Sequence, residues 1–247
     1  TVYVTGRNGS TLRQACASLP GPGACVPKVV DSASDSELRA FFLELAAETG
    51  GRLDILVNNA YSAVPYFKGR VGQPFWEQPL ELFDEVFKVG VRSHYLATRL
   101  AVPLMQNRGS GLIVNTNSPG CVLYALNVAY GMGKCAIDKM TADMSMELAT
   151  EGIAMVSWWA GVPVQTDDIL DGAIDGGSAR RGLAPGMQFV PSFQSLYRTA
   201  LATTPLFEGR ALAALARDAR GRVAASGMAV ISSQLARRYG VRDERGL

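Results

Sequence analysis

Short apolar runs rich in β-branched residues recur along the chain, and segments with helical spacing separate them. The runs lie at 2–4, 25–30, 55–57, 112–114, 153–156 and 228–231. Each is short and lacks strict alternation, as in parallel strands that are buried on both faces. Strands and helices that alternate in this way predict βαβ units, and therefore an α/β fold with a doubly wound parallel sheet.

The helical segments carry recognisable start and stop signals. Ser34 and Glu37 form an S-x-x-E capping box, apolar residues follow at helical spacing, and Gly50 marks the end. Apolar positions over 82–100 predict one long amphipathic helix, and those over 137–148 predict another. Residues 167–186 are Gly-rich and weakly periodic, which predicts a mobile loop before the last helix and strand.

Composition narrows the class of protein. The 247 residues are 48% hydrophobic, which favours one large domain over 1–247. The net charge of +2 gives no reason to expect nucleic acid as a partner, and no apolar run reaches the roughly 18–20 residues of a membrane span. The four cysteines form no C-x-x-C pair, so we expect reduced thiols. The single histidine, His94, is expected to pack inside a helix.

Polar residues stand where the predicted strands end. They are Gly6-Arg7, Asp31, Asn58-Asn59 and the run from Asn115 to Ser118. Ligands of a doubly wound sheet bind beyond the carboxyl ends of its strands. We therefore expect these residues to converge on one edge of the sheet.

Tyr130 and Lys134 stand four residues apart, in the stretch AYGMGK. This spacing places both side chains on one helix face, one turn apart. A nearby ammonium favours the phenolate, so we expect Lys134 to lower the pKa of Tyr130 from its reference value of about 10. Such a phenol can exchange a proton with a carbonyl oxygen near neutral pH. Two ordinary residues on one helix share this spacing, so the surrounding motifs decide.

Several motifs in order along the chain resemble the short-chain dehydrogenase/reductase family. They are Asn58-Asn59-Ala60, the strand end at Asn117-Ser118, the Tyr130/Lys134 pair, and Ala160-Gly161 followed by Thr166. The resemblance covers nearly the whole chain. It implies a Rossmann-like fold and hydride transfer between NADPH and a ketone or aldehyde, with Tyr130 as the proton donor.

A narrower resemblance, to one vertebrate group within that family, rests on further segments. They are Tyr61, Phe75-Trp76-Glu77, Ser118-Pro119-Gly120, Val164-Gln165-Thr166 and the run from Leu235 to Gly240. It implies steroid-like or xenobiotic carbonyl substrates and association with the endoplasmic reticulum; a cytoplasmic protein is otherwise expected. By the same analogy, the helices at 80–106 and 130–150 would form the surface of a homodimer or tetramer.

The resemblance also assigns cofactor contacts. Arg7 would pair with the 2′-phosphate of NADPH, and Asp31 would accept a hydrogen bond from the adenine amino group. Asn59 and Ala60 would pass the adenosine ribose, and Thr166 would meet the nicotinamide carboxamide. Lys134, together with Tyr130, would hold the nicotinamide ribose.

The cofactor-binding turn departs from the family. Thr5-Gly6 begins like the family's T-G-x-x-x-G-x-G turn, but Ser10 and Leu12 stand where the next glycines would fall. The first five residues align instead with the family's second strand. The first strand and the Gly-rich turn, about 30 residues, are therefore expected to be missing, which would leave a gap between the strands that hold Val4 and Val57.

Two catalytic positions also depart. The family's serine, thirteen residues before Tyr130, is Asn117 here, while Ser118 is one residue along and would face away on a regular strand. The family's helix asparagine aligns with Lys88, whose ammonium would repel Lys134 or extend into solvent. Either Asn117 or Ser118 would position the carbonyl. A catalytically silent Rossmann-like binding protein, or an isoform fragment, is the alternative interpretation.

Overall fold

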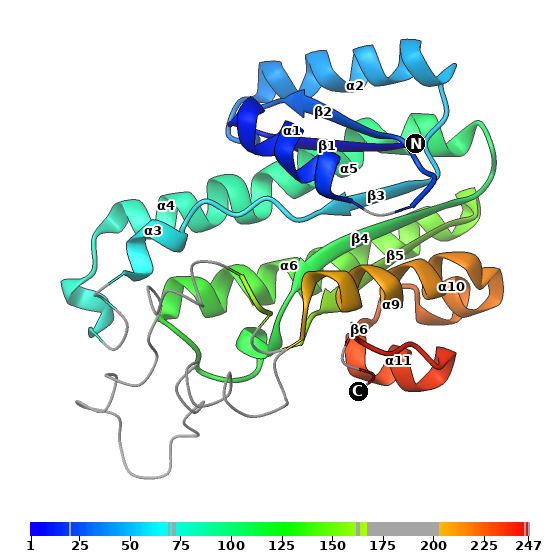
Figure 1. Cartoon of the computed structure of the whole chain (residues 1–247). Coiled ribbons are helices and arrows are strands. Elements are labelled where there is room, and N and C mark those ends of the chain that lie inside the picture. The colour runs from blue at the N-terminus through cyan, green and yellow to red at the C-terminus, as the bar shows by residue number, and fades with distance from the viewer. Residues whose placement is uncertain are drawn as a thin grey trace.

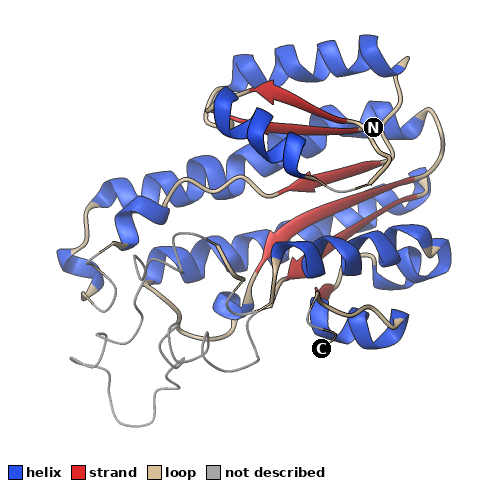
Figure 2. Ribbon diagram, in the orientation of Figure 1, coloured by secondary structure: helices blue, strands red, loops and turns tan. Residues whose placement is uncertain are grey.

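The structure is a computed structural model that describes residues 1–19, 21–68, 70, 73–161, 164–166, 203–244 and 246. Six parallel strands form two sheets flanked by helices (Figures 1 and 2). One sheet pairs β1 (Val2–Gly6) with β2 (Cys25–Val29). The other has the order β3 (Ile55–Asn58), β4 (Gly111–Asn117), β5 (Ile153–Trp159) and β6 (Ala229–Ile231). The predicted Rossmann-like fold class and all six strands are confirmed. The predicted loop over 167–186 lies outside the described residues.

A break separates the two sheets, as the sequence predicted. The strands β1 and β3 face it, and neither pairs with the other. Apolar side chains on these strands stay exposed: Val2 is 60% exposed, Ile55 40% and Val57 43%. In a continuous doubly wound sheet such positions would be covered. The gap therefore lies between the strands that hold Val4 and Val57.

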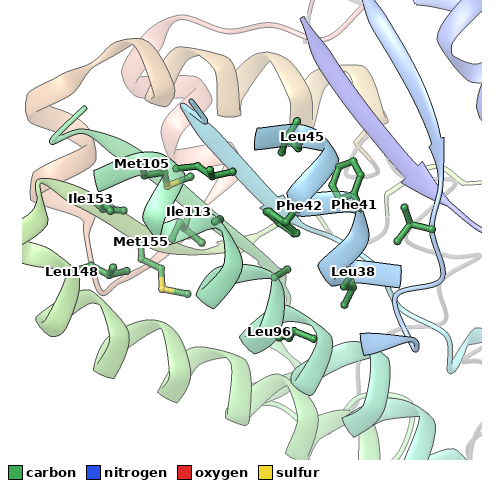
Figure 3. Close-up of a cluster of buried hydrophobic side chains, with 14 residues drawn as sticks. Leu38, Phe41, Phe42, Leu45, Leu96, Met105, Ile113, Leu148, Ile153 and Met155 are labelled. Carbon is green, nitrogen blue, oxygen red and sulfur yellow. The ribbon is translucent and has the colours of Figure 1, made fainter. Parts of the chain in front are cut away.

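Apolar side chains on alternate positions of β4 build a core on each face of the sheet. Ile113 points toward α2 (Asp35–Thr49) and α5 (Ser93–Gln106), in the cluster shown in Figure 3. Leu112 and Val114 point to the other face, against α9 (Pro205–Arg217) and α11 (Ser232–Tyr239). The remaining helices of the described residues are α1 (Gly9–Ser18), α3 (Val64–Phe67), α4 (Leu80–Phe87), α6 (Val128–Leu148) and α10 (Ala219–Ala225). Short helical turns lie at η1 (Phe75–Glu77), η2 (Lys88–Arg92), η3 (Pro119–Cys121) and η4 (Ala149–Glu151).

The capping signals around α2 are confirmed in part. The Ser34 hydroxyl accepts a hydrogen bond from the Glu37 amide at 3.3 Å. Gly50 ends the helix in the left-handed conformation with φ 63°. The Glu37 carboxylate, however, accepts from the amide of Asp31 at 2.8 Å and not from that of Ser34, so the reciprocal half of the predicted capping box is not formed. Glu37 instead holds the backbone just after β2.

The long helix predicted over 82–100 is present but is not a regular α-helix, because a π-helical turn, η2, separates α4 from α5 while the backbone stays right-handed. Gly90 lies in this turn, and a methyl group there would come within 3.0 Å of the Tyr61 ring. Glycine weakens a regular α-helix at this position. The Tyr61 ring occupies the space that a larger side chain would need. Such turns are often found at functional sites.

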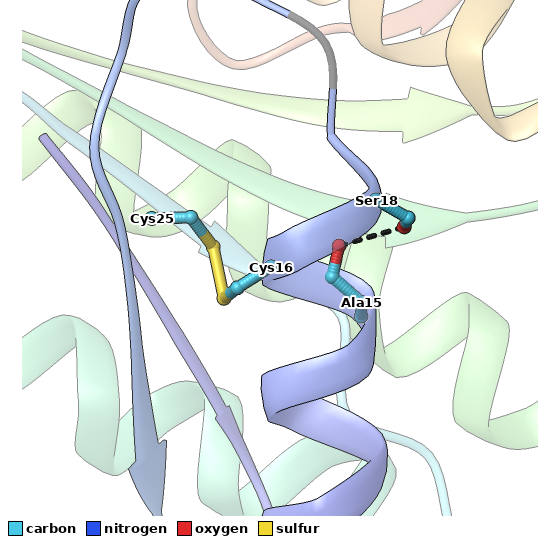
Figure 4. The surroundings of a disulfide bond; sticks show 4 residues. All are labelled: Ala15, Cys16, Ser18 and Cys25. Atoms are coloured by element: carbon cyan, nitrogen blue, oxygen red, sulfur yellow. Dashed lines mark hydrogen bonds between the residues drawn. A yellow bond between two sulfur atoms is a disulfide. The ribbon is translucent and has the colours of Figure 1, made fainter.

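The expectation that all four cysteines are reduced is also wrong. Cys16 on α1 and Cys25 at the start of β2 form a disulfide, with their Cα atoms 5.3 Å apart (Figure 4). The helix α1 packs against β2 and returns the chain to within bridging distance, which spacing alone does not reveal. Cys121 and Cys135 are free.

Candidate active site

Ser118 and Tyr130 meet at the carboxyl end of β4. The Ser118 Oγ and the Tyr130 Oη lie 2.6 Å apart, a hydrogen-bond distance. The Ser118 Oγ also accepts from the Gly120 amide at 3.2 Å as η3 begins. The helix α6 starts just before Tyr130, because the Asn127 side chain caps it by accepting from the Tyr130 amide at 2.8 Å. Both ends of the Ser118–Tyr130 contact are therefore fixed by local hydrogen bonds.

Asn117 faces a different part of α6. Its Nδ2 donates to the Lys134 carbonyl oxygen at 3.0 Å and to the Asp138 Oδ1 at 2.6 Å, and it lies 3.1 Å from the Ser157 Oγ. Neighbouring residues at the end of β4 thus touch successive turns of α6: Ser118 meets Tyr130, and Asn117 meets the turn from Lys134 to Asp138. Of the two residues proposed to position the carbonyl, the structure brings Ser118 to the phenol and leaves Asn117 away from it.

Lys134 lies beside the rings of two tyrosines. Its Nζ is 5.5 Å from the centroid of the Tyr130 ring and 5.1 Å from that of the Tyr61 ring, within the range of cation–π contacts. Burial lowers the pKa of Lys134 to about 8, while the charge of Asp138 acts in the opposite direction. The ammonium therefore faces the ring of Tyr130.

The expected lowering of the Tyr130 pKa is wrong for this structure. Burial raises the pKa of Tyr130, and the hydrogen bond with Ser118 opposes this change without cancelling it. Desolvation penalises the phenolate more than the nearby groups stabilise it. Tyr130 is consequently held as a protonated phenol, the form that can donate a proton.

Tyr61 is a member of the site that the sequence analysis did not single out. Its ring meets the Tyr130 ring edge to face, with centroids 6.3 Å apart, and Phe67 contacts Tyr130 in the same manner at 5.9 Å. The Tyr61 hydroxyl is buried without a hydrogen-bond partner among the described residues. Burial also raises the pKa of Tyr61. The available signal was the motif N-N-A-Y, which places a tyrosine directly after Asn58-Asn59-Ala60.

His94 is buried in α5, as predicted, and it lies close to this site. Its Nε2 is 3.1 Å from the Ala60 carbonyl oxygen, and because a carbonyl can only accept, Nε2 carries the proton. The Nδ1 is buried without a partner in the described part of the chain. Burial lowers the pKa of His94 to about 4, and the positive charge of Lys134 adds to that effect.

The residues predicted to hold the cofactor lie at several strand ends. Arg7, Asn59 and Thr166 are exposed. Asp31 is half-buried, and its Oδ1 accepts from the Ala33 amide at 2.8 Å. Ala60 contributes its carbonyl to His94. Among the described residues, no hydrogen bond or ring contact links any of these to Tyr130, and the break in the sheet separates Arg7 and Asp31 from Asn59 and Ala60.

Two other positions bear on the cofactor and on Lys134. The Asn8 side chain accepts hydrogen bonds from the amides of Ser10 and Thr11, at 3.0 and 3.2 Å, and so caps the N-terminus of α1. Because β1 aligns with the family's second strand, α1 is not the equivalent of the helix that follows the Gly-rich turn. Lys88 is exposed, which agrees with the second of its two predicted arrangements, in which its side chain extends into solvent.

Comparisons with known proteins agree with this geometry. A family model described as short chain dehydrogenase matches residues 1–167. Dehydrogenase/reductase SDR family member 1 from Homo sapiens is 40% identical over 249 residues, covering 100% of this chain and 76% of the relative. The protein of the same name from Mus musculus is 38% identical, with the same two coverages. A solved structure of NAD+-bound xylitol dehydrogenase superposes with a TM-score of 0.74 at 20% identity, covering 93% of this chain and 86% of that one.

The fold and the comparisons lead to one assignment. The order of the strands and the break between β1 and β3 are those that the family resemblance implied. Because the family match covers residues 1–167 and the human relative aligns along the whole chain, the chain belongs to the short-chain dehydrogenase/reductase family, whose members are oxidoreductases that bind a nicotinamide cofactor.

Proposed function

We propose that this protein reduces ketones or aldehydes with NADPH, and that Tyr130 donates the proton. The observation that carries the proposal is the 2.6 Å contact between the Ser118 Oγ and the Tyr130 Oη, with the Lys134 ammonium beside the same ring. The carbonyl oxygen of a substrate placed beside this contact can accept hydrogen bonds from both hydroxyls. Two hydroxyl donors and a nearby cation suit the negative charge that develops on that oxygen.

Each residue has a separate task in the reaction. A bound nicotinamide supplies the hydride that reaches the carbonyl carbon. Tyr130 gives its phenolic proton to the carbonyl oxygen, and Ser118 holds that oxygen in place by hydrogen bonding. Lys134 stabilises the phenolate that remains and would hold the nicotinamide ribose. The raised pKa of Tyr130 supports the reductive direction, because the phenol starts protonated.

The fit of the cofactor differs along its length. Tyr130 and Lys134 suit the nicotinamide end, and the exposed guanidinium of Arg7 at the end of β1 suits a 2′-phosphate. At the pyrophosphate the fit is poor, because Ser10 and Leu12 stand where the glycines of the turn would fall and the break between β1 and β3 lies where the family's first strand would be. This difference keeps the silent binding protein as the second candidate.

Substrate, compartment and assembly belong to the same proposal. Steroid-like or xenobiotic carbonyls are the substrates that we propose, on the narrower resemblance described in the sequence analysis, together with association with the endoplasmic reticulum and a homo-oligomeric state. No helix in the described part of the chain is both long enough and apolar enough to cross a membrane.

Two measurements on this chain test the proposal. Fluorescence titration with NADPH measures cofactor binding, and loss of NADPH absorbance with a panel of ketones and aldehydes measures reduction. We expect Tyr130→Phe to keep NADPH binding, weakened only by the loss of one hydroxyl contact to the nicotinamide ribose, and to lose reduction by about 10²-fold or more. Tyr124→Phe is the matched control, since Tyr124 is 40% exposed and lies outside the contact. A chain that binds NADPH but reduces no member of the panel supports the silent binding protein.

A further inference from the structure

Asp138 lies one turn beyond Lys134 on α6 and receives hydrogen bonds from two strands. Its Oδ1 accepts from the Asn117 Nδ2 at 2.6 Å and from the Trp159 Nε1 at 3.3 Å. The Ser157 Oγ donates to the same oxygen. Asn117 ends β4, and the other two donors lie on β5. One carboxylate oxygen therefore ties α6 to the ends of two neighbouring strands.

Two of the three donors to Asp138 are buried, while Asp138 itself and Trp159 are half-buried. Asn117 is 5% exposed and Ser157 is 1% exposed. A hydrogen bond to a charged acceptor in such surroundings is stronger than a neutral one, and the loss of the acceptor leaves buried donors unpaired. Asn117 also donates to the Lys134 carbonyl oxygen at 3.0 Å, so the same network holds the backbone of the lysine.

The charge of Asp138 reaches the Lys134 side chain as well. Burial opposes the ammonium, and Asp138 is the first group that acts in its favour. The other titratable groups around the ammonium are Tyr130 on α6, Cys121 on η3, His94 on α5, and Tyr61 in the loop after β3. Burial raises the pKa of Cys121 to about 12 and lowers that of His94 to about 4, so neither carries charge at neutral pH.

We propose that Asp138 is a positioning residue for the Tyr130–Lys134 pair: its carboxylate anchors α6 to the ends of β4 and β5 and keeps Lys134 charged beside the phenol. The inference rests on the proposed function for its role in catalysis. Asn117 then connects the end of β4 to Asp138, and Ser118 takes the role of the family's serine in positioning the carbonyl.

The test measures the titration of Lys134 by NMR in protein with isotope-labelled lysine, and Lys134→Met identifies the resonance. We expect Asp138→Asn to lower the pKa of Lys134 by about 0.5 or more below that of the parent, because it removes the charge that favours the ammonium. Asp143→Asn is the matched control, because Asp143 lies on the same helix, is exposed and pairs with Lys139 at 2.7 Å. Trp159→Phe removes one donor to Asp138 but no charge, so it should leave the titration unchanged.

The second readout separates this inference from the proposed function. The titration needs neither cofactor nor substrate, so an inactive parent would contradict the proposed function alone. In an active parent, Asp138→Asn should shift the alkaline limb of the pH–kcat profile in the same direction, and Asp138→Glu should restore it. If the pKa of Lys134 in Asp138→Asn equals its pKa in the control Asp143→Asn, the proposal is overturned. If Asp138→Asn does not fold, Asp138→Ser takes its place, and failure of both to fold assigns Asp138 a purely structural role, which also overturns it.

Discussion

The Oγ of Ser118 lies 2.6 Å from the Oη of Tyr130, whereas the neighbouring Asn117 turns toward Asp138. Twelve residues separate Ser118 from Tyr130, one fewer than the thirteen expected for the family's serine. The sheet pairing of β4 ends at Asn117, so the next residue is released into the turn that leads to η3. A shift of one residue along the sequence thus keeps a hydroxyl beside the phenol.

Substitutions at these two neighbours should have different effects. Ser118→Ala should lower kcat for carbonyl reduction by about 10²-fold with little loss of stability, because it removes a donor to the developing oxyanion. Asn117→Ala should instead destabilise the protein by roughly 1–3 kcal/mol, because it breaks a buried hydrogen bond to a carboxylate. Steady-state kinetics and urea unfolding of both variants measure the difference. Parent-like turnover in Ser118→Ala would remove Ser118 from the mechanism.

Lys134 should cost the folded protein stability at neutral pH. Its pKa is lowered to about 8 from an ordinary value of 10.5, so below pH 8 the folded state holds an ammonium that the unfolded state solvates better. Lys134→Met should therefore raise the free energy of unfolding at pH 7 by about 1–3 kcal/mol and abolish reduction. As pH rises from 8 to 10.5 the folded state releases this proton while the unfolded state keeps it, so the parent gains stability and the advantage of Lys134→Met should shrink. Urea unfolding of both proteins across this pH range is the measurement, and a gain that grows with pH would contradict the burial of Lys134.

His94 should make stability fall in acid. Its pKa is lowered to about 4 from 6.5, so between pH 4 and pH 6.5 the imidazole is protonated in the unfolded state but neutral in the folded state. The stabilisation is complete above pH 6.5 and is lost as pH falls toward 4, by up to about 3 kcal/mol. His94→Gln lacks this titration and keeps a donor for Ala60. Its unfolding free energy should depend less on pH over that range, and an equal slope in both proteins would refute the assignment, since the chain contains one histidine.

The sequence predicted the strands better than the chemistry of the site. Each strand is a local apolar run, so its position can be predicted from neighbouring residues alone, and the break between β1 and β3 follows from the family's strand order. The Cys16–Cys25 bridge and the π-helical turn at η2 depend on contacts between segments distant in the sequence or in different elements. Such contacts leave no local pattern.

The site shows the same limit at the level of single atoms. The spacing of Tyr130 and Lys134 correctly placed them one turn apart, but it could not show which part of the phenol faces the ammonium. The rings of Tyr61 and Phe67 pack around Tyr130 and shield it from solvent, and this burial decides the direction of its pKa. Desolvation depends on the whole surroundings of a group, which spacing does not encode.

The Tyr61 hydroxyl should be dispensable for stability. It is buried without a partner in the described structure, and an unpaired buried hydroxyl costs free energy. Tyr61→Phe keeps the ring beside Lys134 and should raise the free energy of unfolding by about 0.5–1 kcal/mol. Tyr61→Leu removes the aromatic face and should lower it. Urea unfolding of both variants gives the comparison, and a less stable Tyr61→Phe protein would reveal a partner, such as a buried water, for this hydroxyl.

Gly133 should be irreplaceable, although it lies inside a helix. It stands between Tyr130 and Lys134 on α6, and a methyl group there would overlap the Cγ1 atom of Val86 on α4. Val86 is 1% exposed and branched at Cβ, so it has little freedom to move aside. Gly133→Ala should therefore destabilise the protein by about 1–3 kcal/mol, despite the better helical propensity of alanine, and should impair reduction by moving α6. The control is Gly209→Ala on α9, where nothing lies within 4 Å of an added methyl and the same exchange should stabilise the protein by about 0.5–1 kcal/mol. Equal effects of the two substitutions on urea unfolding would show that α4 and α6 can separate without cost.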